Sequence, residues 1–389
     1  MRPAASKQRH DVDKLLQCHG SAESGLRPAA GGIFFPEMEG EGGTGRREGG
    51  GGQQECGSHW LRRTDEASSS VSTTVLLYYL YVGLSSPNEA CEEQLAWGAD
   101  LNLNGRIRVS TEGINGTLDG DATSVQEYMR RMDAKFSQQQ IDWKLGTYPP
   151  ECLRRFKGLV CKVTKEIIST DLDPAALERV VRAGPGPHLT PEEWHQIITR
   201  DPPGNLCLID ARNYYETRIG RFEWTATSGA GGNETRMLPL DPFTRQFSDF
   251  FRVFKDGGEQ LEQLRGKKIL MYCTGGVRCE RASAFLRAQG LLDVSQLSGG
   301  IHAYLETYGD DAACCFKGAN FVYDSRIAVR GGSSSQTVVG KCCVCSCKHD
   351  DYTFQLRCSA CRVLVLVCPD CATKDARELE LECEMCTKG

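Results

Sequence analysis

The sequence has no apolar run long enough to cross a membrane, and its first residues lack the apolar core of a secretion signal. It also has no excess of positive charge. The formal net charge of the 389 residues is −5, which does not indicate nucleic-acid binding. No motif for a flavin, a haem or a nucleotide is present. We therefore expect a cytoplasmic protein without a membrane anchor, long enough for two or three domains.

The first 70 residues have few apolar side chains and are rich in Gly, Glu, Arg and Ser. Such a segment cannot bury enough apolar surface to offset the entropy of ordering it, so residues 1–70 are predicted to be a disordered, Gly-rich leader. An organelle transit peptide is the alternative. The acidic residues Asp11, Asp13, Glu23 and Glu37 disfavour it.

Residues 71–182 are predicted to form an α/β domain of the ferredoxin-like (acylphosphatase-like) kind. The pattern of apolar residues predicts strands at 75–83, 106–111, 116–119 and 141–146, with helices at 88–101 and 124–136. This order, βαββαβ, is typical of that fold. One more apolar strand at 158–163 precedes a connector at 183–187 that contains Pro and Gly.

Residues 188–312 alternate between predicted strands and helices, which favours a parallel sheet covered by helices on both faces. Thr190 and Pro191 are residues of the types that commonly begin a helix, so a helix is predicted to start there. A buried strand is expected at 206–209, and active sites of such sheets lie beyond the carboxyl ends of the strands. The Gly-rich segment 224–234 is expected to be an irregular inserted loop.

The stretch Cys273-Thr274-Gly275-Gly276-Val277-Arg278 follows an apolar strand, 269–272, and precedes a helix at 280–289. A cysteine in that position meets successive backbone N–H groups and the positive end of the helix dipole. Arg278 adds a positive charge, so the thiolate is favoured over the thiol. We name residues 273–278 the cysteine loop and predict that Cys273 is a nucleophile. The competing interpretation is a buried structural cysteine.

The size of the loop narrows its chemistry. Four residues separate Cys273 from Arg278, whereas cysteine phosphatases use five to surround a tetrahedral phosphate. The smaller ring suits a persulfide, whose outer sulfur the backbone amides would hold. Cys279 follows the loop directly, and it is interpreted either as a resolving thiol that exchanges with such a persulfide or as a small buried residue.

Ten of the 20 cysteines fall within residues 342–386, largely as CxxC pairs. With no secretion signal, metal binding is a better explanation than disulfides. Two tetrahedral sites need eight thiolates, so we predict two structural zinc ions in a small domain at 336–389. The ligand pairing stays open, and Cys343, Cys347 or His349 are possible substitutes. The predicted ligands are Cys342, Cys345, Cys358, Cys361, Cys368, Cys371, Cys383 and Cys386.

These motifs together resemble the rhodanese-type tRNA uridine 5-hydroxylases, whose eukaryotic relatives are rhodanese-like domain proteins. The resemblance spans residues 74–388. It rests on Asp-Ala-Arg-Asn-Tyr-Tyr-Glu at 210–216, the cysteine loop, Leu-Ser-Gly-Gly-Ile at 297–301, Ser-Thr-Glu-Gly-Ile-Asn-Gly-Thr at 110–117 and Phe-Lys-Gly-Ala-Asn-Phe-Val-Tyr-Asp at 316–324. It implies a rhodanese domain at 188–312, a family-type extension and linker at 313–335, a tRNA substrate and molecular oxygen as co-substrate.

Several polar residues have two interpretations. Arg212 either pairs with Glu216 across a helical turn or helps to set the field at Cys273. Glu112 and Asn115 lie in a strand-to-strand turn, where Asn-Gly is itself a hairpin signal. The resemblance implies that this turn faces the substrate, with Glu112 in proton transfer or RNA positioning. His302 starts a helix after Gly-Gly and stays outside the predicted site.

Three functions are compatible with these features. The first is a tRNA-modifying enzyme that hydroxylates the wobble uridine, with Cys273, Arg278 and Cys279 catalytic and with Glu112, Asn115 and Arg212 at the substrate. The second is a sulfurtransferase that moves sulfane sulfur from a donor such as thiosulfate to a thiophilic acceptor. The third is an adaptor that interacts through its zinc tail and carries a vestigial rhodanese module.

Overall fold

The structure is a computed structural model that describes residues 73–148, 156–200, 205–228, 233–324, 326–332, 337–373 and 380–387. The predicted leader lies outside these residues, and so do residues 333–335 of the predicted linker. None of the helices in the described ranges combines the length and the apolarity that crossing a bilayer requires.

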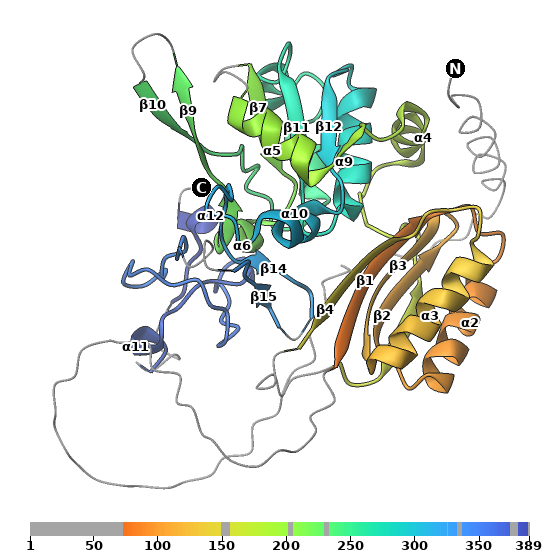
Figure 1. Cartoon of the computed structure of the whole chain (residues 1–389). Helices are drawn as coiled ribbons and strands as arrows, with labels where there is room; N and C mark the ends of the chain where they lie inside the picture. Colours follow the sequence, from red (N-terminus) through yellow and green to blue (C-terminus); the bar gives the residue numbers. More distant parts are fainter. Residues whose placement is uncertain are drawn as a thin grey trace, which may run out of the picture. The chain divides into compact units, whose positions relative to one another are not determined.

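The first domain is a five-stranded sheet with two helices on one face (Figure 1). The strand order is β4-β1-β3-β2-β5, and all pairs are antiparallel except β2 with β5. The predicted order βαββαβ and the strand that follows it are confirmed. The elements are β1 (Thr74–Tyr81), α2 (Pro87–Asp100), β2 (Asn104–Ser110), β3 (Gly113–Gly120), α3 (Ala122–Lys135), β4 (Asp142–Thr147) and β5 (Leu159–Val163).

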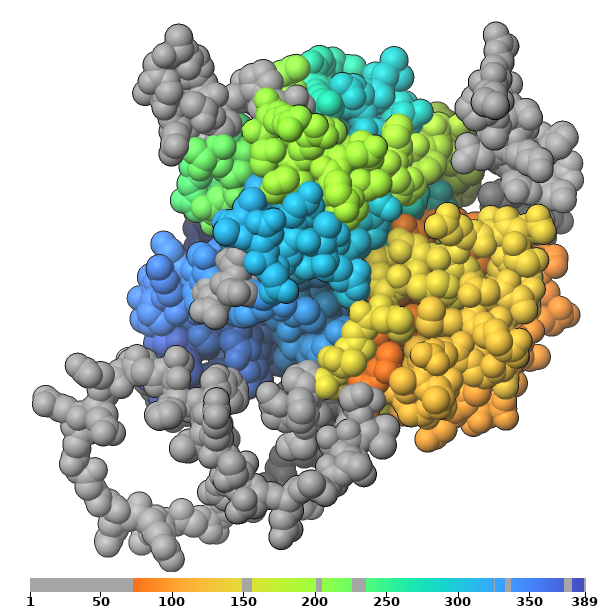
Figure 2. All heavy atoms as spheres, viewed as in Figure 1, coloured from red at the N-terminus to blue at the C-terminus, as the bar shows by residue number. Residues whose placement is uncertain are grey.

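Successive side chains of β1 point alternately to the two faces of the sheet. Leu76, Tyr78 and Leu80 are buried in the core under the two helices. The helices α2 and α3 turn their polar sides outward, and these sides form part of the surface seen in Figure 2. Leu77 and Tyr79 point to the other face of the sheet, which is therefore free to pack against a second layer.

The second domain contains a four-stranded parallel sheet in the order β6-β12-β11-β7. Two apolar clusters cover its two faces, one built around Phe250 and Phe285 and the other around Trp194 and Tyr304. The predicted layered α/β architecture is confirmed. The strands are β6 (His188–Leu189), β7 (Leu206–Asp210), β11 (Lys268–Tyr272) and β12 (Val294–Leu297), and the helices are α4 (Pro174–Ala183), α5 (Pro191–Arg200), α6 (Tyr214–Thr217), α7 (Asp249–Val253), α8 (Glu259–Glu262), α9 (Val277–Ala288) and α10 (Gly300–Tyr308).

Two local features differ from the sequence-based expectation. The segment 224–234 was predicted to be irregular, and this is wrong: β9 (Trp224–Ser228) and β10 (Asn233–Met237) pair as an antiparallel hairpin. Threonines alternate along this segment and favour strands, while the glycines are confined to the residues between them. Helix α4 was not predicted, although Asp173 accepts the N–H of Ala176 and caps it at 2.8 Å.

The last part of the chain packs against the second domain. Strand β13 (Phe316–Gly318) pairs with β8 (Gly220–Phe222), and β14 (Asn320–Phe321) pairs with β15 (Ala328–Val329). The cysteine-rich residues follow, with the short helices α11 (Pro369–Ala372) and α12 (Glu384–Thr387). One apolar cluster joins Tyr214 and Tyr215 of α6 to Phe321 and Tyr352, so the tail and the second domain share a core.

Candidate active site and cysteine clusters

The cysteine loop begins at the carboxyl end of β11, and its last two residues, Val277 and Arg278, belong to the first turn of α9. Gly276 precedes the helix with a φ of 99°, a conformation that favours glycine, and its N–H donates to Cys273 Sγ at 3.1 Å. The carbonyl groups of Cys273 and Thr274 accept the N–H groups of Ile301 and His302 at 3.0 and 3.1 Å. The first turn of α10 therefore holds the cysteine loop in place through these two hydrogen bonds.

The environment of Cys273 favours its thiolate. Burial raises the pKa, but the Cys279 thiol, the Arg278 charge and the N–H groups of Cys279 and Arg278 outweigh it and lower the pKa to about 5. A thiolate with donors already in place is a prepared nucleophile. The residue is 0% exposed, so a reactant reaches it only when the covering side chains move.

Arg278 is held by a carboxylate that the sequence did not connect with it. Its guanidinium pairs with Glu216 through two bonds of 2.6 and 2.7 Å, with both side chains buried. Glu216 also accepts the hydroxyls of Tyr323 at 2.7 Å and Thr274 at 3.1 Å and the N–H of Asn213 at 3.0 Å. Arg278 lowers the pKa of Glu216 although burial opposes it, so this carboxylate stays charged.

Arg212 does not pair with the Glu216 carboxylate. Its guanidinium binds Asp210 at 2.7 and 2.9 Å and donates to the carbonyl oxygen of Gly220 at 2.6 Å. The side chain is 0% exposed. Because its donors are taken up by the end of β7 and the start of β8, this geometry favours the structural role over direct contact with a substrate.

Cys279 is in contact with Cys273. Burial and the neighbouring Cys273 raise the pKa of the Cys279 thiol well above its ordinary value. Cys279 therefore carries the proton and donates it toward Cys273. This proximity is compatible with either earlier interpretation, a resolving thiol or a small buried residue, and its catalytic role stays a prediction.

Glu112 and Asn115 bind the backbone of one residue, Ile167. Glu112 accepts its N–H at 2.9 Å, and Asn115 donates to its carbonyl oxygen at 3.2 Å. Glu112 also pairs with Arg281 of α9, whose guanidinium lies 4.9 Å from the Tyr81 ring. Glu112 lies in the turn between β2 and β3, but the prediction that Asn115 lies in this turn is wrong, because Asn115 is paired within β3. The Glu112–Arg281 pair links the first domain to the helix that carries Arg278.

His302 is more buried than a solvated helix start would be. Its side chain is 18% exposed, and Nε2 lies 3.2 Å from the Glu306 carboxylate. Burial lowers the pKa of His302, and the nearby Lys144 and Arg326 act in the same direction, against Glu306. The backbone N–H of His302 itself donates to the carbonyl oxygen of Thr274 in the cysteine loop.

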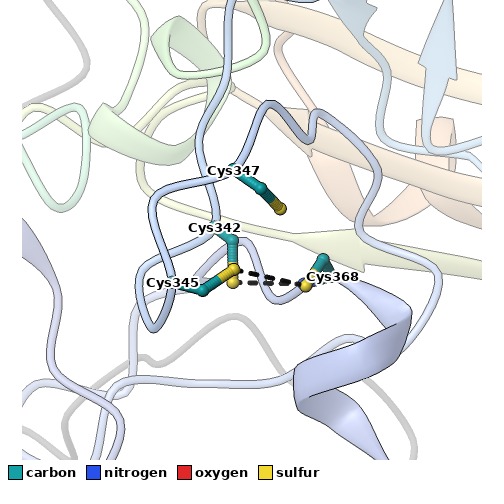
Figure 3. A group of neighbouring side chains, drawn as sticks. All are labelled: Cys342, Cys345, Cys347 and Cys368. Atoms are coloured by element: carbon teal, nitrogen blue, oxygen red, sulfur yellow. Dashed lines mark hydrogen bonds between the residues drawn. The ribbon is translucent and has the colours of Figure 1, made fainter.

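Eight cysteines of the tail gather into two groups, each with its sulfur atoms within 4.8 Å of one another. Figure 3 shows the first group, in which Cys345 Sγ lies 3.6 Å from Cys368 Sγ. In the second group Cys361 Sγ lies 3.5 Å from Cys383 Sγ. The first group is Cys342, Cys345, Cys347 and Cys368, and the second is Cys358, Cys361, Cys383 and Cys386.

The pairing is crossed: the first CxxC pair joins the third, and the second joins the fourth. Cys347, considered above as a substitute, stands in the first group where Cys371 was predicted. The Cys371 thiol nevertheless contacts Cys342, Cys345 and Cys368, so five thiols meet there. Sequence spacing could not settle this choice, because it depends on how the tail folds back.

The two groups fit zinc. Four thiolates around Zn²⁺ at about 2.3 Å stand about 3.8 Å from each other, close to the sulfur separations seen here. Backbone N–H groups also point at the sulfurs: Cys368 donates to Cys342 Sγ at 3.3 Å and Cys383 to Cys358 Sγ at 3.4 Å. Bound ions would hold together a domain that has little core of its own.

This fit makes a measurable prediction. A Cys383→Ser protein should bind one zinc instead of two, because the substitution removes a ligand from the second group only. Elemental analysis of the purified protein gives the ratio. Cys343→Ser is the matched control, since Cys343 is exposed and belongs to neither group, and it should keep both ions. Equal zinc content in the two variants would contradict the assignment.

Three protein families match the chain in succession. Residues 73–167 match the UPF0176 acylphosphatase like domain, residues 190–307 the Rhodanese-like domain, and residues 317–387 the Rhodanase C-terminal family. These matches cover the first sheet, the parallel sheet with the cysteine loop, and the tail with its cysteine groups.

Two bacterial proteins align with most of the chain. The chain is 37% identical to a tRNA uridine(34) hydroxylase of Staphylococcus saprophyticus, over 69% of this chain and 76% of that one. It is 32% identical to a tRNA uridine(34) hydroxylase of Leptospira interrogans, over 84% and 82%.

A plant protein, Rhodanese-like domain-containing protein 6 of Arabidopsis thaliana, is 35% identical over 86% of this chain. The chain spans 55% of that protein's length. From the three domain matches and these identities, the chain belongs to the rhodanese family that combines a UPF0176 acylphosphatase-like domain with a rhodanese domain and includes the tRNA uridine(34) hydroxylases.

Proposed function

We propose that this chain hydroxylates the wobble uridine of tRNA on its 5-carbon and that Cys273 is the reacting residue. The observation that carries the proposal is the Cys273 sulfur, which accepts the N–H of Gly276 at 3.1 Å beside Arg278 and has a lowered pKa, in a chain whose relatives include tRNA uridine(34) hydroxylases. The substrate follows from those relatives. The role of the cysteine follows from its donors and charge.

In this proposal each part of the loop has one task. The N–H of Gly276 and the positive charge of Arg278 hold negative charge on the sulfur, and the same donors suit the outer sulfur of a persulfide. Molecular oxygen would be the co-substrate. Hydroxylation by oxygen also consumes two electrons, and a sulfur that passes from thiol or persulfide to a more oxidised state is a source of them.

The test is mass spectrometry of tRNA nucleosides from cells with and without the protein. Loss of 5-hydroxyuridine and its derivatives from the knockout, with recovery on re-expression, would support the proposal. Identical nucleosides in the two strains would overturn it. The adaptor alternative predicts that a Cys273→Ser protein restores the modification as well as the unchanged protein does.

A sulfurtransferase is the second candidate, and the low pKa of Cys273 favours it as well. That reaction needs only a nucleophilic sulfur that accepts and releases a sulfane sulfur. Purified protein incubated with thiosulfate and cyanide should then form thiocyanate, and Cys273→Ser should remove this activity. Absence of thiocyanate would leave hydroxylation as the supported reaction.

A further inference from the structure

The sheet of the first domain covers the cysteine loop with the face that its helices leave open. Leu77 of β1 and Lys144 of β4 are neighbours in register on this face. A Cβ atom placed on Gly275 would lie 3.0 Å from Leu77 Cδ2 and 3.3 Å from Lys144 Cε. One placed on Gly276 would lie 3.0 Å from the Tyr79 hydroxyl. The two glycines therefore allow the sheet to touch the loop.

Lys144 is the cation of this contact. Its side chain is 2% exposed, and Nζ lies 2.7 Å from Asp142 Oδ1 and 5.0 Å from the centre of the Tyr79 ring. Asp142 is 33% exposed, so water screens part of its charge. An ammonium has three donors, and among the described residues this one makes no well-oriented hydrogen bond. Its charge is only partly compensated.

The groups that face the ammonium come from three elements. Asp142 and Tyr79 belong to the sheet, Cys273 to the loop, and His302 and Glu306 to α10. Burial lowers the pKa of Lys144 below its ordinary value, although the charges of Asp142, Cys273 and Glu306 act against it. Attraction between two charges acts on both partners, so a charged Lys144 favours the thiolate of Cys273 in turn.

A second cation has a physical reason to be there. Arg278 gives both of its terminal nitrogens to the Glu216 carboxylate, so its charge acts on that carboxylate as well as on the sulfur. A buried lysine whose carboxylate partner is partly exposed costs stability.

We propose that Lys144 is an active-site residue supplied by the acylphosphatase-like domain, and that it stabilises negative charge on the Cys273 sulfur or on a group bound to that sulfur. The inference deepens the proposed function and rests on it for the role of Cys273. It assigns the first domain a part in the chemistry in addition to covering the loop.

The experiment measures how alkylation of Cys273 by iodoacetamide depends on pH, with mass spectrometry of the peptide that contains it. Two full-length variants are compared: Asp142→Asn alone, and Asp142→Asn combined with Lys144→Met. The second substitution is made in the Asp142→Asn background because loss of the lysine then leaves no carboxylate unpaired. The midpoint should lie about 1 pH unit higher in the double variant. Equal midpoints in the two folded proteins would overturn the proposal.

Two further variants separate charge from packing. Lys144→Gln keeps a donor for Asp142 and should also raise the midpoint, whereas Lys144→Arg keeps the charge and should stay near the unchanged protein. Lys135→Met is the control, since Lys135 pairs with Glu93 on the helical side of the domain and should not move the midpoint. A shift in the Lys144 variants combined with unchanged tRNA nucleosides in a knockout would keep this assignment and reject hydroxylation.

Discussion

A Cys273→Ser protein should keep its fold and lose tRNA hydroxylation by about three orders of magnitude or more, as enzymes do when their nucleophile is removed. A serine hydroxyl is of similar size and still accepts the N–H of Gly276. It does not ionise near neutral pH, and it forms no persulfide, so both proposed states of the sulfur are lost. The measurement is 5-hydroxyuridine formed per enzyme on tRNA from a knockout strain.

Cys207→Ser is the matched control for this substitution. Cys207 is a half-buried cysteine on the neighbouring strand β7, where it pairs in register with Ile269 of β11, outside the cysteine loop. The control should modify tRNA at the unchanged rate. Activity that survives in Cys273→Ser, or that falls equally in both variants, would show that Cys273 is not the reacting residue.

A Glu216→Gln protein should be destabilised by about 3–5 kcal/mol, the usual cost of removing one partner of a buried ion pair. The substitution leaves Arg278 buried without its counter-charge. It also changes an acceptor that Tyr323 and Thr274 both use, and these residues come from the extension and from the cysteine loop. Loss of this one charge therefore loosens three segments together.

Denaturation by urea measures this effect. Glu262→Gln is the control, because Glu262 forms an exposed ion pair with Arg265 and its loss should leave the denaturation midpoint nearly unchanged. Equal midpoints in Glu216→Gln and Glu262→Gln would mean that the Glu216–Arg278 pair does not hold the loop. Arg278 would then be positioned by the backbone alone.

Features encoded in neighbouring residues were predictable from the sequence. The cysteine loop combines an apolar strand, two glycines and a helix start within a short stretch, so the position of Cys273 at the strand end followed from local pattern. The CxxC pairs likewise indicated metal ligands before any fold was known. In both cases the chemistry depends on residues that are adjacent in the chain.

Features that depend on distant residues were not predictable in the same way. Glu216 meets Arg278 across 62 positions and Tyr323 across 107, and no local pattern connects them. Arg212, which is nearer to Glu216 in the sequence, pairs instead with Asp210, because both residues lie at the end of β7. The placement of Lys144 beside the loop required the contact between two domains, which a single sequence does not encode as a motif.

The charge on Cys273 is the claim that the whole account requires, and the pH dependence of its alkylation tests that claim most directly. Because the covering sheet limits access to the sulfur, the midpoint of the profile is informative and the absolute rate is not. The account predicts that reactivity rises with pH through a midpoint near the pKa of about 5 and is constant from pH 7 upward. A midpoint at about 8.5, the value of an ordinary cysteine, would contradict it.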